Sequence, residues 1–128
     1  MADGKTEVKI ARSPDEVWDL VGQFGGLDEW MPGMESCELD GDIRKIQTMG
    51  MEIHEQLTEH DDDARRISYS IVKAPIPLEF HSATITVKED GDGSLVTWAY
   101  EVRPDELAGA FGPVYDQSAQ AVKTKLEG

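Results

Sequence analysis

Cysteine, basic residues and long apolar runs are all scarce in this sequence. Cys37 is the single cysteine among 128 residues, which excludes an internal disulfide and favours a reducing, cytoplasmic location. No apolar stretch approaches the ~20 residues of a membrane-spanning helix. The first residues also lack the apolar run of a signal peptide. We therefore expect a soluble protein with no membrane insertion.

The charge balance is strongly one-sided. Lysine and arginine number 12 against 26 acidic residues, so the net charge is −14. The acidic residues gather at expected turns, such as residues 59–63 and 89–92. A surface of this sign repels phosphate backbones and anionic membranes, so we expect no nucleic-acid partner.

Metal-binding and cofactor-binding patterns are also missing. His54, His60 and His81 are too far apart in the sequence for the close ligand spacing of a zinc site. A calcium-loop spacing begins at Asp90, but Leu95 stands where that loop requires glycine. We expect no metal and no cofactor.

The order of expected elements defines the fold class. At 128 residues the chain fits one domain, residues 1–128. A strand at 6–10 is followed by a helix that begins at Pro14, with Ser13 as N-cap, and by a short helix within 24–30. A long helix spans 105–127, and Gly112-Pro113 should kink or restart it. Six strands lie between these helical regions, at 34–39, 43–49, 51–59, 66–73, 80–88 and 95–102.

This order predicts an α+β fold. We expect a curved seven-stranded antiparallel sheet wrapped around the long C-terminal helix, with two short helices after the first strand.

Five segments carry a resemblance to a known family: residues 13–18, 27–33, 50–57, 97–100 and 125–127. Through them the chain resembles the START-like helix-grip (SRPBCC) superfamily, in particular its bacterial polyketide cyclase/dehydrase branch, over nearly its whole length. The resemblance implies a helix-grip fold and an internal cavity for a small hydrophobic ligand. It does not imply a reaction, because the superfamily hosts cyclases, hydrolases, lipid carriers, hormone receptors and plant allergens.

Strand alternation identifies two ionisable side chains that point inward. His81 shares its face of the strand with Ala83 and Ile85, and Glu55 shares its face with Ile53. Both faces are otherwise apolar. Burying an unpaired carboxylate is costly, so Glu55 needs a partner or a raised pKa.

Acid–base chemistry is one interpretation of these side chains. His81 would take a proton, Glu55 would orient the imidazole or act as the acid, and Tyr69 or Tyr100 would hydrogen-bond a developing enolate. The alternative is a polar network that only shapes a binding pocket.

Eight further side chains are candidates for ligand contact, because they are aromatic or adaptable and lie on inward faces or near the expected mouth. They are Trp30, Met34, Met49, Met51, Ile71, Trp98, Phe111 and Tyr115. Ordinary core packing is the alternative for the aromatic residues.

These features favour a first hypothesis. The protein binds an aromatic or polyketide-derived molecule and catalyses cyclisation, dehydration or lyase chemistry on it without a cofactor. The rival hypothesis is a non-catalytic carrier or sensor of an apolar metabolite, and a third is an interaction protein with a vestigial pocket. No feature of the sequence indicates an oligomeric state.

Overall fold

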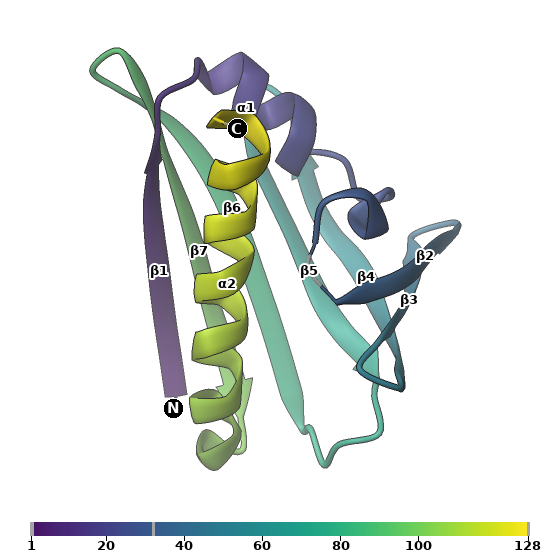
Figure 1. The fold of residues 1–128 in the computed structure, drawn as a ribbon. Coiled ribbons are helices and arrows are strands. Elements are labelled where there is room, and N and C mark those ends of the chain that lie inside the picture. Colours follow the sequence, from purple (N-terminus) through teal and green to yellow (C-terminus); the bar gives the residue numbers. More distant parts are fainter. Residues whose placement is uncertain (1, 32, 128) are drawn as a thin grey trace.

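A seven-stranded antiparallel sheet forms the body of the protein in the computed structural model, which describes residues 2–31 and 33–127 (Figure 1). The spatial order of the strands is β1-β7-β6-β5-β4-β3-β2. The strands are β1 (Ala2–Ile10), β2 (Met34–Asp40), β3 (Ile43–Thr48), β4 (Met51–Asp61), β5 (Arg66–Lys73), β6 (Phe80–Asp90) and β7 (Gly93–Arg103). The predicted fold class is confirmed.

Short turns connect the strands that are consecutive from β2 to β5 and from β6 to β7. The predicted Asp40-Gly41 turn is present, with Gly41 at φ 62°. At the β3–β4 turn Met49 and Gly50 both have positive φ, 50° and 75°. Two successive residues of this kind fit the primed turns whose twist matches that of paired strands.

Several strands are longer than predicted. β1 begins at Ala2, where the expected strand began at residue 6, because the whole segment pairs with β7 from Ala2↔Val102 to Ile10↔Ser94. Pairing with a neighbouring strand extends an element into residues whose own pattern is too polar to indicate a strand.

The helices follow the local signals in the sequence. The first helix, α1 (Pro14–Val21), begins after Ser13, whose hydroxyl accepts a hydrogen bond of 3.3 Å from the Glu16 N–H. A short 3-10 helix, η1 (Leu27–Glu29), follows it. A second one, η2 (Asp105–Leu107), leads into the long α2 (Ala108–Glu127).

The predicted restart of the long helix at Pro113 is not observed. α2 continues through Pro113, which lies in its second turn. Proline leaves the carbonyl of the residue four positions earlier without its helical donor. That residue is Gly109, and both Gly109 and Pro113 are exposed, so water can satisfy the free carbonyl.

The core lies between the concave face of the sheet and the two α-helices. α2 runs along the β1, β7 and β6 part of the sheet, while the β2–β4 part curls away from it (Figure 1). Tyr115, Ala119 and Val122 of α2 are buried in one cluster with Val17 and Val21 of α1 and residues of β1 and β5–β7. Among the described residues, no helix is both long and apolar enough to cross a membrane.

Candidate functional site

An internal cavity of about 500 Å³ lies where the curled half of the sheet leaves α2. Its wall is built by the segment from the end of α1 through η1 to the start of β2, by β3 to β5 and by the first half of α2, with single contributions from β6, β7 and the β5–β6 connection. Most of the lining side chains are apolar. All eight side chains predicted to contact a ligand line it: Trp30, Met34, Met49, Met51, Ile71, Trp98, Phe111 and Tyr115. Their contact with a ligand stays a prediction.

The exposure of two lining residues indicates that the cavity opens between the β3–β4 turn and α2. Two lining residues are large, apolar and exposed: Met49 in the turn, 71% exposed, and Val114 on α2, 44% exposed. Solvent-exposed apolar side chains around a cavity opening provide an apolar path for a ligand to enter.

A buried ion pair forms part of the cavity wall. Arg44 on β3 and Glu55 on β4 are direct cross-strand neighbours and are only 5% and 7% exposed. Arg44 Nε donates to Glu55 Oε1 at 2.9 Å, and Arg44 Nη2 donates to the same oxygen. Arg44 Nη1 donates to the Phe24 carbonyl oxygen, also at 2.9 Å. The inward Glu55 therefore has the partner that its burial requires.

Two aromatic rings lie close to the Arg44 guanidinium. Its carbon lies 4.3 Å from the centre of the Phe24 ring and 4.9 Å from that of the Tyr69 ring. Both distances allow a cation–π interaction. Arg44 donates three hydrogen bonds and contacts two aromatic rings, so its side chain is held in one position within the wall.

His81 has different partners from those predicted. It is 1% exposed, and its ring accepts a hydrogen bond at Nδ1 from the Ile71 N–H at 3.1 Å. Its Nε2 lies 2.6 Å from the Tyr115 hydroxyl oxygen. Burial lowers the pKa of His81 to about 4, so the ring is neutral near pH 7.

The predicted pairing of Glu55 with His81 is wrong. The two residues lie on β4 and β6, and β5 runs between these strands. Adjacent strands lie ~4.7–4.9 Å apart, so the backbones of Glu55 and His81 are separated by roughly 9–10 Å. Arg44 holds the carboxylate, while Ile71 and Tyr115 orient the imidazole.

The tyrosines fall into two groups. Tyr69 and Tyr115 line the cavity, whereas Tyr100 and His81 lie behind this wall. The Tyr100 ring centre is 4.7 Å from that of Tyr115. Burial first, and then the Glu55 carboxylate, raises the pKa of Tyr69 to about 12, and burial raises that of Tyr115 well above 10.0. Both hydroxyls therefore keep their protons at neutral pH.

Sequence reasoning missed Arg44, although a signal for it exists. Arg44 precedes Met49 by the same number of residues as Glu55 follows Gly50. In a hairpin with a two-residue loop, such positions face each other. A tight turn at Met49-Gly50 would therefore have placed a cation opposite the inward carboxylate.

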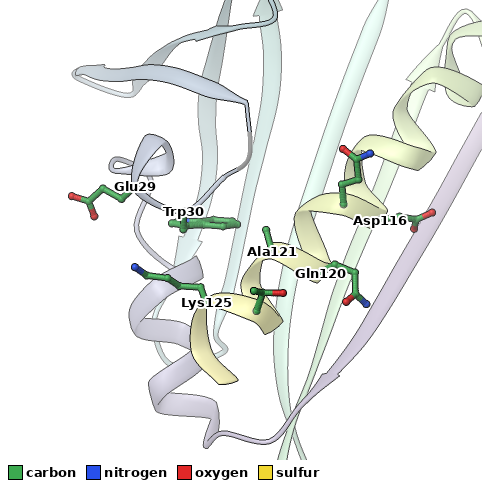
Figure 2. Close-up of a pocket in the computed structure, with 8 residues that line it drawn as sticks. Glu29, Trp30, Asp116, Gln120, Ala121 and Lys125 are labelled. Carbon is green, nitrogen blue, oxygen red and sulfur yellow. The ribbon is translucent and has the colours of Figure 1, made fainter. Parts of the chain in front are cut away.

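A second depression lies on the outer side of α2 (Figure 2). This open groove of about 600 Å³ is lined by Glu29, Trp30, Asp116, Gln117, Gln120, Ala121, Thr124 and Lys125. Trp30 and Gln117 line both the groove and the cavity, so they separate the two. In Figure 2 the Trp30 ring points from η1 toward Ala121. The groove has charged side chains at its rim and little enclosure, so the cavity is the better ligand site.

No metal centre can be built from the side chains of residues 2–31 and 33–127. Within these ranges, no group of three or more His, Cys, Asp or Glu side chains is arranged to hold a metal ion. The polar side chains that line the cavity include hydroxyls, amides and one ion pair.

Solved structures with the same fold cover almost the whole chain. XoxI from Bacillus cereus is 34% identical, with a TM-score of 0.91 over 98% of this chain and 95% of that one. An uncharacterised protein from Bacillus thuringiensis is 29% identical, with a TM-score of 0.91 over 99% of this chain and 100% of that one. A START superfamily protein from Mycobacterium smegmatis is 15% identical, with a TM-score of 0.80 over 99% and 98%, and shows the shared fold alone.

The comparison of whole sequences gives the family. No curated protein matches this chain. The profile of the family described as polyketide cyclase / dehydrase and lipid transport matches residues 1–127. Family and fold together support a protein that binds a hydrophobic ligand in a helix-grip scaffold. The chain belongs to the family described as polyketide cyclase / dehydrase and lipid transport.

Proposed function

We propose that this protein is a carrier or sensor of a small, neutral, largely apolar molecule. The observation that carries the proposal is the charge balance of the cavity wall. Its described lining contains two charged side chains, Arg44 and Glu55, and these neutralise each other. A charged ligand would need an uncompensated partner in this apolar space, whereas a neutral ligand needs none.

Aromatic side chains favour a planar ligand. Trp30, Trp98, Phe111 and Tyr115 line the cavity, and rings prefer offset or edge-to-face contact with other rings. A volume of about 500 Å³ lies within the ~300–1,000 Å³ of typical small-molecule sites. An aromatic or polyketide-derived metabolite fits both features.

The geometry gives little support to catalysis by the predicted acid–base pair. A general base must reach the proton that it abstracts. His81 lies outside the cavity lining, and both of its ring nitrogens are already engaged. Glu55 lines the cavity but is held by Arg44.

One arrangement favours an enzyme as the second candidate. The Tyr69 and Tyr115 side chains line the same cavity as Arg44, and the Tyr69 ring lies against the Arg44 guanidinium. Preorganised donors of this kind stabilise negative charge that develops on a carbonyl oxygen. Such an enzyme would stabilise an enolate with neutral hydroxyls, and a base would have to come from the ligand or from water.

Native mass spectrometry of the purified protein tests the proposal. We expect a neutral apolar compound to copurify and to be released unchanged after incubation. Replacing Glu55 by Gln should then change the affinity for that compound and leave its chemical identity unaltered. Conversion of the compound by the wild type, lost in Tyr69→Phe/Tyr115→Phe, would instead support the enzyme.

A further inference from the structure

The hydrogen bonds behind the cavity wall have a fixed direction that begins at a backbone amide. The Ile71 N–H donates to His81 Nδ1, so this nitrogen carries no proton. A neutral imidazole has one N–H, which must then be on Nε2. His81 Nε2 consequently donates to the Tyr115 hydroxyl oxygen, and Tyr115 is the acceptor in this contact.

A second donor reaches the neighbouring tyrosine. Trp98 Nε1, which can only donate, lies 3.2 Å from the Tyr69 hydroxyl oxygen. Among the described residues, no hydrogen bond joins the Tyr69 and Tyr115 hydroxyls to each other. Each tyrosine oxygen thus accepts one hydrogen bond from outside the pair, Tyr115 from His81 and Tyr69 from Trp98.

Counting the remaining protons shows what the pair must do. Each hydroxyl carries one proton, and neither proton has an acceptor within hydrogen-bond distance among the described residues. Both tyrosines line the cavity, so a bound ligand can supply the acceptor from there.

We propose that the Tyr69 and Tyr115 hydroxyls present their protons to the cavity and thereby select neutral ligands that carry a hydrogen-bond acceptor, such as a ketone, aldehyde or ester. This inference rests on the proposed function. A ligand without an acceptor would displace water and leave a buried hydroxyl unpaired, which costs affinity. His81 is a positioning residue here, because it occupies the Tyr115 oxygen without lining the cavity.

A matched pair of compounds tests the selection. In 2-acetylnaphthalene the carbonyl oxygen is an acceptor, and in 2-isopropenylnaphthalene a methylene group replaces that oxygen in nearly the same shape. Calorimetric titration gives the ratio of the two affinities for each variant. One net hydrogen bond changes an equilibrium by about threefold to tenfold. We expect the double variant Tyr69→Phe/Tyr115→Phe to shift this ratio by about that factor toward the hydrocarbon.

The single variants give a signature that a purely structural role would not produce. In Tyr69→Phe the Tyr115 hydroxyl still accepts from His81 and keeps a free proton. In Tyr115→Phe the Tyr69 hydroxyl still accepts from Trp98 and keeps one as well. Each single variant should therefore retain most of the wild-type ratio, while the double variant loses it. The control is Tyr100→Phe, which removes a hydroxyl next to the cavity wall and should leave the ratio unchanged.

Infrared spectroscopy of the bound ketone makes the test independent of the variants' folding. With wild-type protein, the carbonyl stretch of 2-acetylnaphthalene should shift to lower frequency than in hexane. An unshifted carbonyl, or a double variant with the wild-type ratio, would overturn the inference while the cavity still binds. Loss of the whole preference in one single variant would overturn the equal role given to the two hydroxyls. If neither compound binds to the wild type, the proposed function itself fails.

Discussion

Arg44 donates two hydrogen bonds to a single carboxylate oxygen of Glu55, so the second oxygen has no donor among the described residues. The pair lies in the cavity wall, and both side chains are buried. It gives the cavity two properties that an apolar pair would not. The wall has no net charge, and it still offers an acceptor oxygen to whatever occupies the space.

Removing one partner of this ion pair should lower the free energy of unfolding more than removing both partners. Arg44→Met leaves a buried carboxylate without compensation, and we expect the free energy of unfolding to fall by about 3–5 kcal/mol. The double variant Arg44→Met/Glu55→Leu removes both charges and should recover most of this loss. Urea denaturation of the two single variants and the double variant gives the coupling energy.

An exposed ion pair provides the matched control. Lys9 Nζ and Asp90 Oδ2 are 3.6 Å apart, with both side chains largely in solvent. Lys9→Ala should change the free energy of unfolding by no more than about 1 kcal/mol. A cost of that size for Arg44→Met as well would mean that the pair is not buried as the structure shows.

His81 should make the protein less stable in mild acid. Burial lowers the pKa of the folded imidazole to about 4, against 6.5 for the ordinary group. Below pH 6.5 the unfolded chain therefore binds a proton at His81 that the folded chain does not. The free energy of unfolding falls as the pH decreases toward 4, by about 3 kcal/mol in total from this group.

Urea denaturation between pH 7 and pH 4 measures this loss. Other groups titrate in the same range, so the comparison is with His81→Gln, which keeps them and lacks the imidazole. The stability of His81→Gln should depend less on pH than that of the wild type. Parallel pH profiles would show that the folded protein can protonate His81 and that the ring is more accessible than its hydrogen bonds indicate.

Local patterns in the sequence were sufficient for the fold and for the direction of the inward side chains. Strand alternation placed Glu55 and His81 inward, and both are buried. The Ser13 cap and the Asp40-Gly41 turn also lie where the sequence predicted them. Each of these features depends on residues that are close in the chain, where backbone geometry is decisive.

Contacts between distant elements could not be obtained in the same way. His81 meets Tyr115 because α2 has one particular rotation against the sheet, and helical periodicity defines a face but not its contacts. The sheet order puts β5 between Glu55 and His81, which alternation along single strands does not report. Arg44 was overlooked because a cation between Ile43 and Lys45 is typical of a solvent-facing position.

The cavity mouth can be tested by closing it. Val114 lines the cavity and is exposed beside it, so Val114→Trp should block entry of a ligand without disturbing the core. We expect the affinity for 2-acetylnaphthalene to fall by more than about tenfold, because the indole fills space that the ligand needs. Calorimetric titration measures the affinity, and the thermal midpoint reports the stability.

The matched control is Val72→Trp on β5. Val72 is also a half-exposed valine, but it does not line the cavity. The affinity of Val72→Trp for 2-acetylnaphthalene should equal that of the wild type. Equal losses in both variants would indicate a general effect of an added surface tryptophan, and no loss in Val114→Trp would place the entrance elsewhere.

The three tryptophans allow the occupied site to be located by fluorescence. Trp30 and Trp98 line the cavity, whereas Trp18 does not and donates its indole N–H to Asp62 at 2.9 Å. A cavity ligand that absorbs near the tryptophan emission should quench Trp30 and Trp98 more than Trp18, because quenching by contact and by energy transfer both weaken with distance.

Trp18→Phe should therefore keep the fractional quenching of the wild type or increase it. In Trp30→Phe/Trp98→Phe the remaining emission comes from Trp18, and the fractional quenching should be smaller. Strong quenching of Trp18 alone, with Trp30 and Trp98 unaffected, would place the ligand near α1 and the β4–β5 turn, outside the cavity, and contradict the cavity as the binding site.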